Sequence, residues 1–150
     1  MRGPRRIICV GNRHASEDDT GPRVHDLLSA GPLPEGVELV DGGLAGLDLL
    51  RWIEGADRVV FVDRVKDLGR PGELIVLDAD GLARLEAPDY GHADGLAYLV
   101  KAATAVCGDR TPELALVGVE GEADERTLRA AADASLRLAG RSRSGADDDA

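Results

Sequence analysis

Acidic residues follow several β-rich runs of this 150-residue chain, where they could hold a metal ion or activate water. The first run is followed by Asn12 and then by the acids Glu17-Asp18-Asp19, the second ends in Asp41-Gly42-Gly43, the third in Asp63 and the fifth in Glu120. Ligand sites in open α/β sheets lie beyond the carboxyl ends of the parallel strands, so we expect these acids at one rim. Each acid alone also has a structural explanation, because Asp caps helices and bonds backbone amides in turns.

His92 adds an imidazole to the same rim, since its segment opens the third predicted helix. Two carboxylates and one imidazole give oxygen and nitrogen donors for a divalent transition metal, with room for an outside ligand. Acids and histidines also cap helices or pair with bases, so a structural explanation stays open. His25 falls within the first predicted helix among polar neighbours, and His14 lies in a loop, where it is either incidental or faces a substrate.

Other catalytic motifs are absent or out of context. Asp19-Thr20-Gly21 matches the aspartic protease signature, but that chemistry needs two such loops in an all-β fold. The chain has no HExxH and no G-x-S-x-G, and Cys9 lies inside a predicted strand, where it is a poor nucleophile. We expect Cys9 and Cys107 to be small buried hydrophobes. The loop 11–15 lacks the further glycines of a dinucleotide-binding fingerprint.

The elements that would position these residues alternate between β-rich and helical segments, which indicates an α/β fold. Strands are predicted at Arg6–Gly11, Val37–Gly42, Arg58–Asp63, Glu73–Leu77 and Leu114–Glu120. Helices are predicted at Gly21–Ala30 with Asp19 or Thr20 as its cap, Leu47–Glu54, Asp94–Cys107 and Ala123–Ala139. The link from the third to the fourth strand holds no helix, so the fourth strand should run antiparallel to the third. The prediction is a three-layer α/β/α fold with a mixed, mostly parallel five-stranded sheet.

The charge and amino-acid composition of the chain argue against several classes of protein. The chain has 28 acidic and 18 basic side chains, a net charge of -10 and 3% aromatic residues, which argues against a nucleic-acid-binding surface. The apolar run Ile7–Val10 is too short for a signal peptide or a membrane span. We therefore expect a soluble, cytoplasmic protein with one domain over residues 1–139. Residues 140–150 are expected to form a disordered acidic tail, because they offer nothing to bury.

The ordered series of motifs resembles the nickel–iron hydrogenase maturation endopeptidases, over nearly everything from Ile7 to Ala139. The matching segments are Gly11-Asn12, Glu17-Asp18, Gly21, Arg23, Asp41-Gly42-Gly43, Gly46-Leu47, residues 53–57, residues 60–63, His92, Gly95-Leu96 and Gly118-Val119-Glu120. The resemblance implies a twisted sheet between helices. It also implies a protease that removes a short C-terminal extension from a hydrogenase large-subunit precursor after nickel loading.

The resemblance further implies which residues act. The metal contacts would be Asp18, Asp63 and His92, and Asp18 or Asp63 would orient or deprotonate the attacking water. The nickel is expected to arrive with the substrate, and no organic cofactor is expected. Contacts with the substrate are expected from Asn12, Asp41, Gly42 and Gly43, because the two glycines present no side chain to an approaching backbone.

Four residues depart from the family's pattern, namely Cys9, Asp19, Leu44 and Gly121. None of them removes a proposed metal contact, although Asp19 places an extra negative charge beside Asp18. Two other classes of protein stay open. A non-catalytic hydrogenase assembly factor would bind a precursor without shortening it, and a small-ligand or nucleotide-binding α/β domain would use the acids as helix caps.

Overall fold

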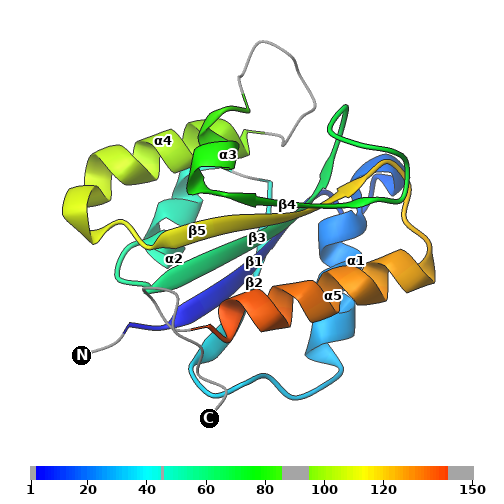
Figure 1. Ribbon diagram of the computed structural model, residues 1–150. Coiled ribbons are helices and arrows are strands. Elements are labelled where there is room, and N and C mark those ends of the chain that lie inside the picture. Colours follow the sequence, from blue (N-terminus) through cyan, green and yellow to red (C-terminus); the bar gives the residue numbers. More distant parts are fainter. Residues whose placement is uncertain (1–2, 45, 86–94, 142–150) are drawn as a thin grey trace.

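A five-stranded sheet with helices on both faces forms the centre of the computed structural model, which describes residues 3–44, 46–85 and 95–141 (Figure 1). The strands are β1 (Arg5–Val10), β2 (Val37–Gly43), β3 (Arg58–Val65), β4 (Leu74–Asp78) and β5 (Glu113–Glu120), in the spatial order β2-β1-β3-β5-β4. Neighbouring strands are parallel except β4, which pairs antiparallel with β5. The predicted mixed, mostly parallel sheet is therefore confirmed.

The position of β4 differs from the simplest expectation. β4 runs opposite to β3, as predicted, but its hydrogen-bonding neighbour is β5, with Leu74 opposite Val119 and Asp78 opposite Ala115. β5 lies between β3 and β4, because the chain crosses over through a helix before β5 pairs in parallel with β3 from Arg58 to Val65. The link from β3 to β4 thus spans two strand positions, because β5 lies between these strands in the sheet.

The helices form the two outer layers. On one face of the sheet lie α1 (Thr20–Ser29) and α5 (Glu125–Ala139), and on the other lie α2 (Leu50–Ile53), α3 (Ala79–Ala83) and α4 (Leu96–Cys107). Short 3₁₀ turns occupy η1 (Ser16–Asp18), η2 (Leu47–Leu49) and η3 (Gly108–Arg110). The helix predicted at 47–54 is therefore split into η2 and α2, and α3 is an addition. Asp19 stands at the N-cap of α1 without a capping hydrogen bond from its side chain, whereas Asp124 caps α5 by accepting from Thr127 N at 2.8 Å.

Side chains alternate between the two faces of the central strands, which divides the hydrophobic core into two clusters. Ile8 and Phe61 pack on the side of α2 and α4, whereas Ile7, Val60 and Val62 pack on the side of α1 and α5. All five side chains are fully buried. Because successive side chains of a strand point to opposite faces, the residues that follow Val62 in β3 alternate in the same way.

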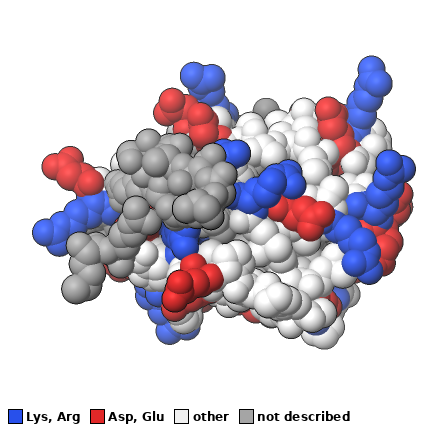
Figure 2. Space-filling model, turned by 60° about the horizontal axis from the view of Figure 1, so that its bottom comes forward, with Lys and Arg blue, Asp and Glu red and all other residues white. Residues whose placement is uncertain are grey.

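Charges of both signs are interspersed on the molecular surface. Figure 2 shows Lys and Arg side chains next to Asp and Glu side chains, with uncharged surface between them. No helix within the described ranges is long and apolar enough to span a membrane. Of the tail predicted at 140–150, the structure describes Gly140, at the C-cap of α5, and Arg141, and the rest lies outside the described residues.

Candidate functional site

The carboxyl ends of β1, β2 and β3 meet at one rim of the sheet. The backbone N–H of Gly11, just after β1, donates to the carbonyl of Gly43 at the end of β2 at 2.8 Å. The N–H of Asn12 donates to the carbonyl of Asp18 at 2.8 Å. The loop after β1 therefore folds back so that η1, with Asp18, lies beside the end of β1.

Asp63 lies inside β3 rather than after it, because the strand continues for two residues to Val65. Its side chain is 0% exposed. Its Oδ1 atom accepts a hydrogen bond from the N–H of Arg64 at 2.8 Å, and its Oδ2 atom accepts none within the part of the chain that the structure describes. Asp63 shares its face of β3 with Phe61 and Val65, which places its carboxylate on the side of α2 and α4.

Asp18 is half-buried in η1. Its backbone N–H donates to Ala15 O at 2.8 Å, which closes the 3₁₀ turn. The guanidinium of Arg64 donates through Nη1 to the carbonyl of Glu17. Since β1 and β3 are adjacent parallel strands, these contacts place the segment of Asp18 beside the end of β3.

The third predicted metal contact, His92, lies outside the described residues. Among the residues that are described, no group of three or more His, Cys, Asp or Glu side chains is arranged to hold a metal ion. The donor chemistry of two carboxylates with an imidazole still suits a divalent transition metal. The set of Asp18, Asp63 and His92 therefore stays a prediction, with the segments of its two acids at one rim.

The other two histidines contact protein groups. His14 is exposed, and its backbone N–H donates to Asn12 Oδ1 at 2.9 Å. His25 is partly exposed on α1, with Nδ1 3.3 Å from Ser29 Oγ. Asn12 itself is exposed and uses its side-chain oxygen for this local turn, and its contact with a substrate stays a prediction.

The residues at the end of β2 have partly structural roles. The Oδ1 atom of Asp41 accepts from Gly43 N at 3.3 Å. A Cβ on Gly42 would lie 2.8 Å from Ile8 Cγ2 and 3.1 Å from Cys9 O, so a glycine is needed there for packing on β1. Gly43 has a φ of +57° and open space around its Cβ position. The Gly43 N–H and carbonyl are both hydrogen-bonded within the protein, and substrate contact at these positions stays a prediction.

Glu120 binds backbone amides of the loop after β3. It is 7% exposed, and its Oε2 atom accepts from Asp67 N at 2.9 Å. Its Oε1 atom accepts from Leu68 N at 2.8 Å and from Gly69 N at 3.0 Å. Asp67 has a φ of +63°, which aligns the amides of the loop after β3 around this carboxylate. Glu120 lies at the carboxyl end of β5, as expected, and both of its oxygens bind loop amides, which agrees with the structural explanation left open for each acid.

The two cysteines differ in exposure. Cys9 is fully buried, and burial, followed by the charges of Asp41 and Asp26, raises its thiol pKa far above the ordinary value. It stays protonated and is not a nucleophile, as predicted. Cys107 is only partly buried, in contrast to the expectation of a core position. Burial and the charge of Glu54 also raise the pKa of this thiol.

Basic residues also lie at the rim, and of these only Arg23 belongs to the matched sequence motifs. Arg13 forms a two-point ion pair with Asp26, at 2.9 and 3.1 Å, and holds the pKa of that carboxyl below its ordinary value. Arg23 and Arg64 line a polar cavity of about 260 Å³ between the start of α1 and the loop after β5. Nothing in the sequence brings these two arginines together, because they meet only through the packing of α1 on the sheet.

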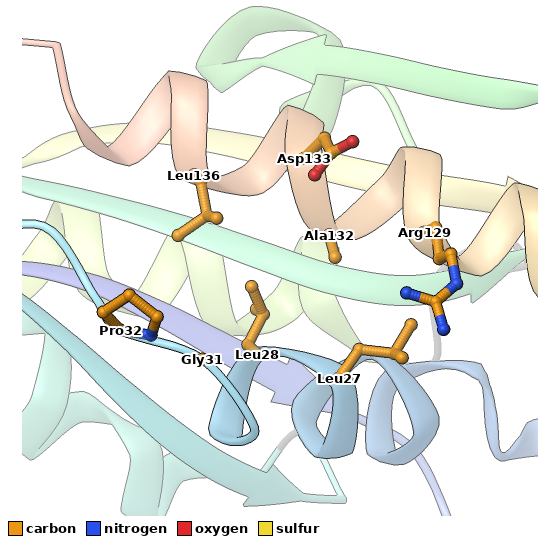
Figure 3. A pocket seen from close by; sticks show the side chains of 8 residues that line it. All are labelled: Leu27, Leu28, Gly31, Pro32, Arg129, Ala132, Asp133 and Leu136. Carbon is orange, nitrogen blue, oxygen red and sulfur yellow. The ribbon is translucent and has the colours of Figure 1, made fainter.

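A second cavity, of about 280 Å³, lies between α1 and α5 (Figure 3). Figure 3 shows Leu28 pointing from α1 toward α5 and Leu136 pointing from α5 toward α1, while Asp133 points away from the gap. The lining is mainly aliphatic, and the cavity lies on the face of the sheet opposite to Asp63. It is a gap in helix packing and not a hydrolytic site.

Comparisons with known proteins agree with this architecture. The chain matches the family model HycI, hydrogenase maturation protease, over residues 22–135. It is 30% identical over 122 residues to the hydrogenase 2 maturation protease of Escherichia coli K12, covering 79% of this chain and 74% of that protein. It is also 30% identical over 147 residues to the hydrogenase expression/formation protein HoxM of Azotobacter vinelandii, covering 89% and 69%.

Solved structures give the same result. The hydrogenase maturating endopeptidase HybD from Escherichia coli superposes with a TM-score of 0.68 and 27% identity, covering 93% of this chain and 90% of that one. The [NiFe] hydrogenase maturation protease HycI from Thermococcus kodakarensis has the same fold, with a TM-score of 0.66, 23% identity and coverage of 91% of each chain. The α/β fold, the matched segment and the level of identity together show that this chain belongs to the hydrogenase maturation protease family and is a peptidase.

Proposed function

We propose that this protein removes the C-terminal extension of a nickel-loaded hydrogenase large-subunit precursor. Membership of the family supports a peptidase acting in hydrogenase maturation. The observation that carries the proposal is the fully buried carboxylate of Asp63 at the carboxyl end of β3, next to the segment of Asp18. A buried carboxylate is costly for a fold, so one at a rim where ligands bind favours a chemical role.

The chemistry of the site follows from its residue types. Amide hydrolysis without a Ser or Cys nucleophile requires an activated water and a polarised scissile carbonyl. Nickel brought by the precursor supplies the polarisation, and Asp18, Asp63 and His92 have the donor atoms to contact it. Asp18 or Asp63 accepts a proton as the water oxygen attacks the carbonyl carbon, and the proton then passes to the departing amine as the C–N bond breaks. Cleavage would thus depend on a loaded precursor.

The test compares a cognate precursor prepared with and without nickel. Purified protein is incubated with each form, and loss of the C-terminal peptide is followed by mass spectrometry. We expect cleavage of the loaded form only, and Asp18→Asn should slow it by about 10²-fold or more. Asp19→Asn is the matched control, because it removes a neighbouring charge from the same loop and should leave cleavage intact.

Three results would contradict the proposal. They are equal cleavage of both precursor forms, equal cleavage by Asp18→Asn and the wild type, and binding of the loaded precursor without shortening. The last result would favour a non-catalytic assembly factor.

A further inference from the structure

Arg64 contacts both segments that contain the proposed catalytic carboxylates. It follows Asp63 in β3 and is half-buried at the rim. Its backbone N–H donates to Asp63 Oδ1 at 2.8 Å. Its guanidinium donates through Nη1 to the carbonyl of Glu17, the residue before Asp18.

The direction of the Arg64 side chain follows from strand alternation. Asp63 lies on the side of α2 and α4, so Arg64 points to the opposite face, toward the start of α1. A guanidinium is planar and always charged, and its hydrogen bonds are stronger than those of a neutral donor. The loop after β1 is therefore held at two points, by Asn12 N on Asp18 O from β1 and by the Arg64 side chain from β3.

We propose that Arg64 is a positioning residue for cleavage, which fixes the segment of Asp18 relative to Asp63. This inference rests on the proposed function of these two carboxylates. Hydrolysis requires both groups to meet one scissile bond, and a misplacement of about 1 Å costs about 10²-fold in rate. Arg64 acts through the two acids and not on the substrate.

The surroundings of Arg64 allow this role to be separated from folding. Its side chain lines the polar cavity of about 260 Å³, together with Thr20 and Glu122 among other residues. Truncation of the side chain would therefore leave a polar space that admits water and not an apolar void. A variant without the guanidinium should keep its fold.

The experiment uses the full chain with Arg64→Met, which keeps the aliphatic length without donors, and Arg64→Lys, which keeps a charged donor. The control is Arg5→Met, because Arg5 Nη2 donates to Glu35 O at 2.7 Å at the opposite end of the sheet. Three measurements are made on each protein. They are kcat and KM on the nickel-loaded precursor, the Kd for Cd²⁺ by titration, and amide hydrogen exchange over residues 15–20.

We expect Arg64→Met to lower kcat by about 10- to 100-fold while KM stays within about threefold. The Kd for Cd²⁺ should rise about tenfold, and residues 15–20 should exchange faster. Arg64→Lys should recover most of the lost kcat, and Arg5→Met should change none of the three measurements.

Wild-type kcat and exchange in Arg64→Met would overturn the inference and leave the proposed function intact. Reduced kcat with unchanged exchange would also overturn it, because Arg64 would then act directly on substrate. A wild-type protein that cleaves no loaded precursor would instead overturn the proposed function. In that case the exchange rates alone show whether Arg64 holds the loop.

Discussion

Asp63 and Glu120 are two buried carboxylates at the ends of neighbouring strands, and the structure uses them differently. Glu120 is 7% exposed and accepts three backbone N–H groups from the loop after β3. Asp63 is 0% exposed and accepts the backbone N–H of the next residue in the chain. Both lie on the parallel pair β3 and β5, where Asp63 is opposite Gly118 and Val65 is opposite Glu120.

The difference shows how a carboxylate at this rim is assigned to structure or to chemistry. Three amides around one side chain satisfy both oxygens of Glu120 and fix a loop. The hydrogen bond from Arg64 N–H to Asp63 joins neighbouring residues of β3 and does not tie Asp63 to the loop at 67–69. Burial alone does not distinguish a structural from a catalytic carboxylate, so variants of both residues are needed.

The largest expected effect is the loss of activity in Asp63→Asn. Asparagine has nearly the same shape but cannot act as a base, so kcat on a loaded precursor should fall by about 10²- to 10⁴-fold. The free energy of unfolding should change little, because asparagine keeps an oxygen that can accept from Arg64 N–H. Cleavage assays and urea denaturation of the same preparation measure both quantities. A large loss of stability would show that Asp63 is structural like Glu120 and would break the comparison.

The opposite result is expected for Glu120→Ala. Three backbone N–H groups lose a charged acceptor, which should lower the free energy of unfolding by about 2–3 kcal/mol. Glu120→Gln retains one acceptor oxygen and should lose less. Cleavage at a temperature where the variants are folded should match that of the wild type. If Glu120→Gln were stable but inactive, Glu120 would belong to the reacting groups after all.

A third carboxylate sharpens the contrast, because Asp26 is exposed and paired with Arg13. Arg13 lowers the folded-state pKa of Asp26 below the ordinary 3.8, so the ionised form favours the folded state. This stabilisation is present above the unfolded-state pKa and is lost as the pH falls through the folded-state pKa. Exposure makes it small, and salt should weaken it.

Urea denaturation of the wild type and Asp26→Asn from pH 7 to about pH 3 tests this prediction. The difference in unfolding free energy should shrink as the pH falls, and cleavage should be unaffected. A difference that stays constant with pH would show that the ion pair is not its cause.

Much of the fold was predictable from local sequence. Continuous Val, Ile and Leu runs gave all five strands to within about two residues, because burial on both faces requires such runs. Asp63 was predicted at the end of the third strand, which in fact continues to Val65. The end of β3 depends on the tertiary burial of Asp63, which a local sequence pattern does not reveal.

The remaining features depend on contacts between distant residues. The amides that bind Glu120 lie about 50 residues earlier in the chain, at Asp67 to Gly69. The pairing of β4 with β5 and the bond from Arg64 to Glu17 likewise join segments far apart in the sequence. Residue types alone suggested convergent acids, but only the packed structure shows which acid holds a loop.

The strand order also affects how the chain is completed during synthesis. β4 ends at Asp78 and its neighbour in the sheet, β5, begins at Glu113, so β4 leaves the ribosome before this partner exists. Ile75 and Leu77, which pack against the core in the finished fold, are then exposed on the nascent chain. β5 completes the sheet by insertion between β3 and β4. A translation stop before Glu113 would thus leave β3 and β4 without the strand that pairs with both. Their unpaired backbone groups would then be exposed to aggregation unless chaperones cover them.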